Sequence, residues 1–203
     1  MSLTDQPPRT DGPVALPTRL MGELTALDQR LYEAVAGADT PTLDEFFRRL
    51  SLSANKSVLW LGIAGVIAVA GGSTGRRAAL NGLASIGLAS ATANLVGKQV
   101  TDRRRPDRVG AGVPGGRHVP MPESTSFPSG HSASAFAFAE GVSATAPALG
   151  LPLRLAAVAV AYSRVHTGVH YPGDVVGGAL IGLTAGEVAP RIVAFAQRRW
   201  RAR

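Results

Sequence analysis

Residues 57–75 read SVLWLGIAGVIAVAGGSTG, and residues 78–97 read AALNGLASIGLASATANLVG. Neither stretch contains a charged residue, and a helix of either length would cross about 30 Å of hydrocarbon. Gly, Ala and Ser are frequent in both stretches, as is typical of helices that pack closely inside a membrane. The two stretches therefore predict membrane-spanning helices.

Three more apolar runs follow along the chain, at residues 132–149, 153–163 and 175–196. The first contains one acid, Glu140, and the second continues toward Val169. With the two charge-free stretches they predict an all-α, polytopic membrane helical bundle of about five spanning helices. The alternative is a compact soluble all-helical domain whose buried helices are unusually rich in alanine.

The chain has 203 residues, a length that suits one domain. It contains no cysteine, which excludes disulfides, thiolate metal sites and cysteine nucleophiles. Its net charge of +7 would fit a nucleic-acid binder, a phosphate-handling protein or a membrane protein. Because no nucleic-acid-binding motif or aromatic platform accompanies the charge, we expect no nucleic-acid partner. The mean hydropathy of +0.13 lies between the soluble and membrane classes and indicates two different regions.

The order of these regions follows from local composition. Residues 1–19 hold four prolines among polar residues and predict a disordered tail, with no apolar stretch of the kind found in a signal peptide. Residues 20–55 predict amphipathic helices, which would lie along a membrane surface or pack as ordinary helices. Residues 56–197 would form the transmembrane domain, and residues 198–203 a basic tail.

Three polar segments stand at the ends of the apolar runs: KQVTDRRRP at 98–106, PSGH at 128–131 and SRVHTGVHYPGD at 163–174. As the chain passes up and down through a bilayer, the second run ends, the third begins, the fourth ends and the fifth begins at the same surface. We therefore expect the three segments to converge at one membrane face.

The residues that would converge there suit a phosphate group. Lys98, Arg105 and Arg164 supply three cations, and the planar arginine fork matches phosphate oxygens. Ser129 and Gly130 stand at a predicted helix start, where unpaired N–H groups and the helix dipole favour an anion. Several charge-assisted hydrogen bonds of about 1.5–3 kcal/mol each would hold a phosphoryl group.

Two histidines add reactivity to this predicted phosphate site. Of His131 and His170, one can attack phosphorus while the other protonates the leaving oxygen. Asp174 lies four residues after His170 across a Tyr-Pro-Gly turn. It can accept from the imidazole Nδ1–H, which fixes the tautomer that exposes Nε2 as the nucleophile.

Simpler interpretations exist for each part of this set. Ser129, Gly130 and Asp174 would act only as helix caps, and Arg103–Arg105 as a solvated or topology-determining charge run. His166, one turn before His170, is expected to be a structural residue.

The remaining charged residues are expected to have no role in catalysis. Glu140 and Glu187 lie in apolar helices and would form hydrogen bonds between helices. We expect rim charges at Arg104, Arg108 and Arg117.

Together the three segments resemble the three-part signature of the type 2 phosphatidic acid phosphatase (PAP2) superfamily, in its order and spacing. The matching patterns are K-x6-RP from Lys98, PSGH from Pro128 and SR-x5-H-x3-D from Ser163. The superfamily also includes bacterial class A acid phosphatases and vanadium haloperoxidases. The resemblance covers roughly residues 56–190. Its membrane members commonly have six spanning helices, and here the polar tail and amphipathic segment replace the first.

The resemblance implies a role for each matching residue. His170 resembles the nucleophile that forms a phosphohistidine, Asp174 the carboxylate that orients it, and His131 the general acid and later the base. No metal or other cofactor is implied. The phosphate-binding set would comprise Lys98, Arg105, Ser129, Gly130 and Arg164.

We therefore expect an integral membrane phosphatase that hydrolyses the phosphomonoester or diphosphate of a phosphatidate-type or polyprenyl lipid. The alternatives are a non-catalytic lipid-phosphate carrier or scaffold, and a soluble relative of the acid phosphatases or haloperoxidases. We expect a cell-membrane protein. Both ends of the spans are rich in arginine, so the charge count alone does not give the orientation; if the motif cations are set aside as catalytic, the arginines at the opposite ends favour a site that faces the outer side. The motifs predict neither the particular lipid nor the oligomeric state.

Overall fold

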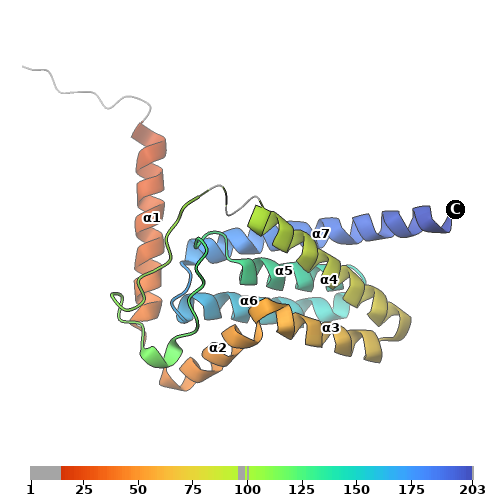
Figure 1. Ribbon diagram of the computed structural model, residues 1–203, viewed down its shortest axis with the longest axis horizontal. Coiled ribbons are helices and arrows are strands. Elements are labelled where there is room, and N and C mark those ends of the chain that lie inside the picture. The colour runs from red at the N-terminus through yellow and green to blue at the C-terminus, as the bar shows by residue number, and fades with distance from the viewer. Residues whose placement is uncertain (1–14, 96–98, 100, 203) are drawn as a thin grey trace, which may run out of the picture.

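The computed structural model describes residues 15–95, 99 and 101–202, and every regular element in these residues is helical. Figure 1 shows α4, α5, α6 and α7 running side by side, with α1 and α2 at one end of this bundle. The seven α-helices are α1 (Ala15–Ala36), α2 (Pro41–Ser53), α3 (Val58–Ala70), α4 (Gly72–Leu95), α5 (Gly130–Ser143), α6 (Gly150–His166) and α7 (Pro172–Arg201).

Helix α5 is the centre of the bundle, since it packs against α4, α6 and α7. Glycines every four residues bring α7 onto it: Gly178, Gly182 and Gly186. A Cβ on Gly182 would lie 2.4 Å from the carbonyl oxygen of Ala133, and one on Gly178 would lie 2.3 Å from that of Ser129. The two backbones can approach this closely only because the glycines carry no side chain.

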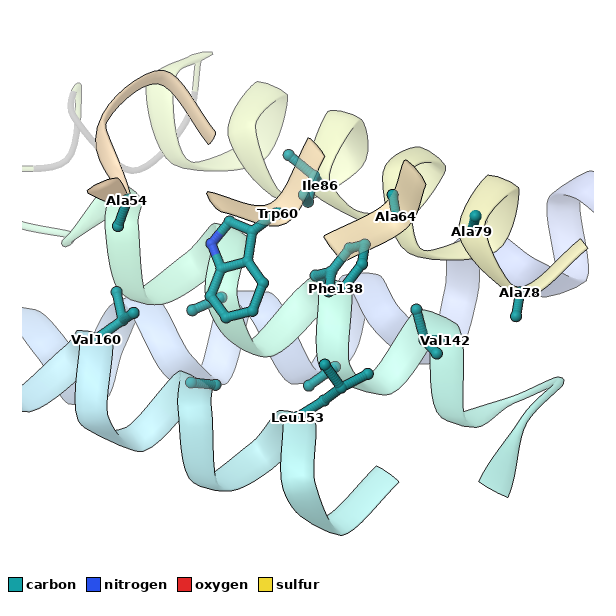
Figure 2. Close-up of a cluster of buried hydrophobic side chains, with 13 residues drawn as sticks. Ala54, Trp60, Ala64, Ala78, Ala79, Ile86, Phe138, Val142, Leu153 and Val160 are labelled. Carbon is teal, nitrogen blue, oxygen red and sulfur yellow. The ribbon is translucent and has the colours of Figure 1, made fainter. Parts of the chain in front are cut away.

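The apolar core lies where α3, α4, α5 and α6 meet. Trp60 and Phe138 are fully buried, and their ring centroids are 5.3 Å apart. Figure 2 shows both rings between α3 and α6, with Leu153 and Val160 on α6 closing the cluster from the other side. The rest of the cluster is mostly alanine, so the large rings fill space that the small residues leave.

The structure corrects the boundary between the first two apolar runs. Helix α3 ends at Ala70 and α4 begins at Gly72, so Arg76 and Arg77 lie inside α4 rather than between two spans. The turn is made by two consecutive glycines, of which Gly72 has a φ of +56° that L-residues rarely adopt. At Gly71 the limit is space, since a Cβ there would lie 2.7 Å from the Cα of Gly75.

Two described segments, Pro147–His166 and Pro172–Arg201, are long and apolar enough to cross a bilayer. Helices α2 and α3 meet at a bend of 66° and would together form a third, broken span. The chain is therefore an all-α membrane bundle, as predicted. Of the roughly five predicted spans, two or three meet the length and hydropathy of a span within the described residues. The predicted basic tail is partly helical, because α7 continues to Arg201.

The segment Ala15–Ser57, here called the N-terminal layer, contains α1, α2 and the short 3-10 turn Asn55–Ser57. Helix α1 begins at Ala15, inside the region predicted as a disordered tail, and residues 1–14 lie outside the described residues. Figure 1 shows α1 running across the direction of α6 and α7, at the end of the bundle where α7 begins. Helix α2 packs against α6.

Candidate active site

The predicted motifs converge at the end of the bundle that carries the N-terminal layer. A cavity of about 240 Å³ is lined by Arg105, Gly130, His131 and His170, so that each of the three polar segments contributes to it. The predicted site residue Lys98 lies outside the described residues. The other lining residues are Ala54, Lys56, Ser57, Ser90, Asn94, Pro122, Ser124, Pro128 and Ser134.

A tight turn between α6 and α7 holds His170. Helix α6 is ended by Gly168, whose φ of +73° is a left-handed conformation that favours glycine. The N–H groups of Val169 and His170 then donate to the carbonyl of Arg164, at 3.1 and 3.2 Å. The backbone is thereby fixed on both sides of the imidazole, whose side chain is almost fully buried.

The carboxylate of Asp174 lies behind the His170 ring and is fully buried. Its Oδ2 is 3.4 Å from His170 Nδ1 and accepts from the backbone N–H of Tyr171 at 2.8 Å and from Ser126 Oγ. Its Oδ1 accepts from Arg103 Nη1 at 2.9 Å. The Tyr171 contact caps α7, so Asp174 both caps the helix and faces the imidazole.

Arg105 occupies the other side of the imidazole. Its Nη1 is 3.2 Å from His170 Nε2 and donates to the Val169 carbonyl at 2.8 Å. Nε donates to the Ser124 carbonyl at 2.9 Å, and Nη2 reaches the Thr125 carbonyl and Ser124 Oγ at 3.2 and 3.3 Å. A guanidinium has no acceptor, so its contact with Nε2 requires an unprotonated nitrogen there and the proton on Nδ1.

Arg164 is a buried cation at the last turn of α6. Its Nη1 donates to Ser51 Oγ and, at 3.4 Å, to the Ser51 carbonyl. Its Nε is buried and has no hydrogen-bond partner among the described residues. An unpaired N–H on a buried charged group is costly, and an anion would satisfy it.

The start of α5 supplies the other wall of the site. Ser129 is fully buried, and its Oγ accepts from the N–H of Ser132 at 3.4 Å as the N-cap. His131 Nε2 is 2.9 Å from Oδ1 of Asn55 in the N-terminal layer. A Cβ on Gly130 would meet no atom within 4 Å, so the protein's own packing does not require glycine there.

Comparison with known proteins gives the family of the chain. The sequence profile of the PAP2 superfamily matches residues 78–198, which is more than half of the chain. The chain belongs to the PAP2 superfamily. It is a membrane phosphatase of that superfamily, whose matched region contains all the described motif residues.

Two solved structures have the same fold as this PAP2 phosphatase. One is Aquifex aeolicus LpxE, with a TM-score of 0.63 and 24% identity over 81% of this chain and 95% of that one. The other is the first transmembrane PAP2-type phosphatidylglycerolphosphate phosphatase from Bacillus subtilis, with a TM-score of 0.64 and 23% identity over 87% of each chain. No curated protein matches the sequence.

Burial changes the pKa of His170. It lowers the pKa of His170 to about 4, since the charged form is poorly solvated there. The hydrogen bond to Asp174 opposes this shift, whereas the charges of Arg105 and Arg164 add to it. The imidazole is therefore neutral at neutral pH, as a nucleophile must be.

The expectation that Arg117 is a rim charge is wrong. Its side chain is fully buried and is paired with Asp44 at 2.8 Å. It also donates to the carbonyls of Val35 and Ala38 at the end of α1 and just beyond it. Arg117 lies in the long loop, the connection from α4 to α5. It therefore joins the long loop to both helices of the N-terminal layer.

The expectation that Glu187 forms a hydrogen bond between helices is wrong, because its side chain is exposed on α7 and has no hydrogen-bond partner among the described residues. The expectations for His166 and Glu140 are confirmed. His166 is buried, and its Nε2 is 3.0 Å from Asp44 Oδ1, which is a structural contact. Glu140 joins α5 to α6 through two hydrogen bonds from Arg154, at 2.6 and 2.7 Å.

Sequence reasoning missed the polar residues that contact the motif residues from outside the motifs. Asn55 contacts His131, Ser51 contacts Arg164, and Ser126 contacts Asp174. Nothing in their spacing marks them, because their partners are between 48 and 113 positions away. Arg103 belongs to the arginine run that ends at Arg105, so the sequence marked it as part of a basic cluster. Its contact with Asp174 could be recognised only from the fold.

Within the described residues, no group of three or more His, Asp or Glu side chains could hold a metal ion. The site offers instead one neutral imidazole between a carboxylate and a guanidinium. It can bind an anion and present a nitrogen nucleophile to it.

Proposed function

We propose that this protein hydrolyses the phosphomonoester or diphosphate of a membrane lipid through a phosphohistidine on His170. The observation that carries the proposal is the line Asp174–His170–Arg105, with 3.4 Å from Oδ2 to Nδ1 and 3.2 Å from Nε2 to Nη1. This order places the orienting carboxylate and the phosphate-binding cation on opposite sides of one nucleophile.

The first step forms a bond from His170 Nε2 to phosphorus and breaks the bond from phosphorus to the lipid oxygen. A phosphoryl oxygen that accepts from Arg105 Nη1 would take over the donor that now faces Nε2, and so free the lone pair for attack. His131 gives its proton to the leaving oxygen. Asp174 stabilises the positive charge that develops on His170.

The second step regenerates the enzyme. His131, now neutral, takes a proton from water, and the resulting hydroxide attacks phosphorus and breaks its bond to Nε2. Inorganic phosphate leaves, and His131 is again protonated. Burial and the nearby charge of Arg164 lower the pKa of His131, so the protonated form that each cycle requires depends on the bound phosphate anion. Asn55 Oδ1, at 2.9 Å from His131 Nε2, can accept from a protonated Nε2 and orient the ring.

Phosphate binding would rest on donors from three elements. Arg164 Nε, which has no partner among the described residues, is a ready donor to a phosphoryl oxygen. Lys98 is proposed as a third cation from its place in the motif. The backbone N–H of Gly130, at the start of α5, would add the helix dipole. Ser129 is proposed from its place in the motif, since its own N–H already donates to the Asp174 carbonyl at 2.9 Å.

A lipid substrate is supported by where the site lies. The cavity opens at the end of the bundle, where a head group would meet water while its tail stays beside apolar helices. Candidate substrates are phosphatidate-type lipids and polyprenyl phosphates or diphosphates. Phosphatidylglycerol phosphate belongs in the same panel, because the solved phosphatase from Bacillus subtilis is named for it.

The test is phosphate release by the detergent-purified protein from this lipid panel, with EDTA present throughout. We expect turnover of at least one lipid, inhibition by vanadate, and loss of activity to background in His170→Ala. The matched control is His118→Ala, since the one side-chain hydrogen bond of His118 among the described residues is to the Val113 carbonyl in the long loop, at 3.0 Å. An active His170→Ala enzyme would sink the mechanism.

The intermediate itself can be measured. Brief incubation with a ³²P-labelled lipid phosphate should leave label on the protein that is stable in alkali and released by acid, as expected of a phosphohistidine. Label should accumulate in His131→Ala, if its loss slows the second step more than the first. Lipid binding without turnover or labelling would instead favour the carrier alternative.

We also propose that the site faces the outer side of the cell membrane. Arg76, Arg77 and Arg201 line one pocket of about 500 Å³ at the end of the bundle far from the site, which suits a cytoplasmic surface. Because the chain has no cysteine, single cysteines at Glu123 and Gln197 can report each end. On intact cells a membrane-impermeant maleimide should label the first and not the second, and the reverse pattern would overturn the orientation.

A further inference from the structure

Helix α1 has three distinct faces. Its buried face contains Tyr32 and Ala36, which pack against the bundle end together with Val113 and Val165. A second face carries the charged residues Arg19, Glu23, Arg30 and Glu33. The third is a stripe of leucines that are about half exposed: Leu20 (56%), Leu24 (51%), Leu27 (52%) and Leu31 (49%).

The buried face ends in a carboxylate that contacts the catalytic region. Asp28 accepts from the N–H of Gly173, in the first turn of α7, at 2.7 Å. Its Oδ2 pairs with Arg103 Nη2, while Nη1 of the same guanidinium donates to Asp174 Oδ1 at 2.9 Å. Arg103 also lies over the Tyr171 ring, 4.3 Å from its centroid. One arginine thus joins α1 to the carboxylate behind the proposed nucleophile.

The leucine stripe borders the lipid-facing surface of the bundle. A groove of about 640 Å³ runs between the stripe and the start of α7, and its apolar walls include Leu24, Leu27, Phe127 and Val176. Val176 is 58% exposed and, one turn further along α7, Leu180 is 60% exposed. Because α7 is a candidate span, this exposed surface faces hydrocarbon, and the groove continues it onto α1.

We propose that α1 is a membrane-surface helix that positions the catalytic dyad, His170 and Asp174, with its leucine stripe in the acyl chains of the surrounding leaflet and its Asp28 holding Arg103 against Asp174. The lipid-phosphatase part of this inference rests on the proposed function. The occupant of the groove is lipid acyl chain, because its walls are continuous with a lipid-facing span and because α1 runs across the bundle end, as a helix in the membrane plane does (Figure 1).

The position of the charged face agrees with this placement. Glu23 and Arg30 are exposed, and Glu23 pairs with Arg19 on the same helix, at 3.1 Å. A helix whose leucines enter the acyl region and whose charges stay in water is fixed in depth and rotation. Asp28, on the face between them, is then held at a constant place relative to α7.

Depth in the membrane can be measured without any assay of activity. Single cysteines replace Leu27 on the stripe and Arg30 on the charged face, in a chain that has no other cysteine, and each carries a nitroxide spin label in phosphatidylcholine–phosphatidylglycerol vesicles. We expect the Leu27→Cys label to collide mainly with oxygen and the Arg30→Cys label mainly with a water-soluble nickel chelate. Equal access of the chelate to both labels would overturn the membrane placement.

The link to the dyad is tested by Asp28→Ala, with Glu23→Ala as the matched control on the same helix. We expect kcat to fall about tenfold in Asp28→Ala with KM changed less than twofold, because the dyad and not the substrate site is disturbed. Asp28→Asn keeps an acceptor for the Gly173 N–H and should recover part of the loss. Equal kcat in Asp28→Ala and wild type, or a fall that thermal unfolding accounts for entirely, would overturn the positioning role.

The failure of this inference is distinguishable from failure of the proposed function. The kcat comparison is run on p-nitrophenyl phosphate as well as on lipids, so that it reports on the dyad whichever phosphate ester is the natural substrate. If no lipid is hydrolysed but the soluble ester is, the proposed substrate class fails and the positioning test still stands. If no ester is hydrolysed, the spin-label depths alone confirm or overturn the placement of α1.

Discussion

The α4–α7 bundle and the N-terminal layer are held in place by different forces. In the bundle, glycine and alanine let backbones approach until Cβ atoms would collide, as at Gly178 and Gly182. The N-terminal layer is fixed to the rest of the molecule by polar contacts from Asp28, Asp44, Ser51 and Asn55. A few buried or aromatic side chains, such as Tyr32 and Phe47, add to these contacts. Its apolar residues remain largely exposed along α1.

The difference separates two tasks of the site. The bundle supplies the residues proposed to react, at helix ends whose positions close packing fixes. The N-terminal layer supplies a polar partner to several of them: Asn55 to His131, Ser51 to Arg164 and, through Arg103, Asp28 to Asp174. The layer also forms part of the cavity wall, through Ala54, Lys56 and Ser57.

Removal of the buried cation that anchors the layer should have the largest effect on stability. Arg117→Met removes the cation that pairs with Asp44 and donates to the Val35 and Ala38 carbonyls, and should lower the stability by roughly 3–5 kcal/mol. Thermal unfolding in detergent measures this, with the exposed Arg104→Met as control. Equal stability of the two variants would show that the layer does not depend on this anchor.

A small addition inside the bundle should have the next largest effect. Gly182→Ala places a Cβ 2.4 Å from the Ala133 carbonyl oxygen, and the helices must separate at a cost of roughly 1–3 kcal/mol. The control is Gly87→Ala on α4, where a Cβ meets nothing within 4 Å. If both variants unfold at the same temperature, close backbone contact is not what holds α5 to α7.

Loss of a single polar contact from the layer should change catalysis more than stability. Asn55→Ala removes the acceptor 2.9 Å from His131 Nε2 and should lower kcat about tenfold, equivalent to about 1.4 kcal/mol. Asn55→Asp keeps an oxygen acceptor and should retain more activity than Asn55→Ala. A change confined to KM would contradict the assignment of this contact to His131.

The pH dependence should show the smallest but most specific effect. Burial lowers the pKa of His170 to about 4, so the imidazole is neutral at pH 7 and becomes protonated only as the pH approaches 4. We therefore expect kcat/KM to fall only in that acidic range. Arg105→Gln removes a cation that lowers this pKa, so its acidic limb should move to higher pH. Two substrates whose phosphate groups have different pKa values distinguish titration of the enzyme from titration of the substrate. A fall in kcat/KM that is centred near pH 6.5 with both substrates would contradict a buried nucleophile.

Much of the bundle could be predicted because its signals are local. The charge-free stretches predicted helices at nearly the residues where they form, and the alternation of spans was enough to place the motifs at one end of the bundle. The boundary near Gly71 was misplaced because charges at Arg76 and Arg77 suggested a break, whereas the turn depends on a positive φ at Gly72. Backbone conformation of this kind leaves only a weak trace in hydropathy.

By itself the sequence determined the helical membrane class and the identity of the residues proposed to bind and attack phosphate, since helix length and motif spacing are local properties. Only the tertiary structure decided which polar residues of Ala15–Ser57 contact them, that Arg117 is an anchor and not a rim charge, and that Arg103 joins Asp28 to Asp174. These contacts join positions more than 70 residues apart, and they form only when the long loop and the N-terminal layer fold against the same end of the bundle.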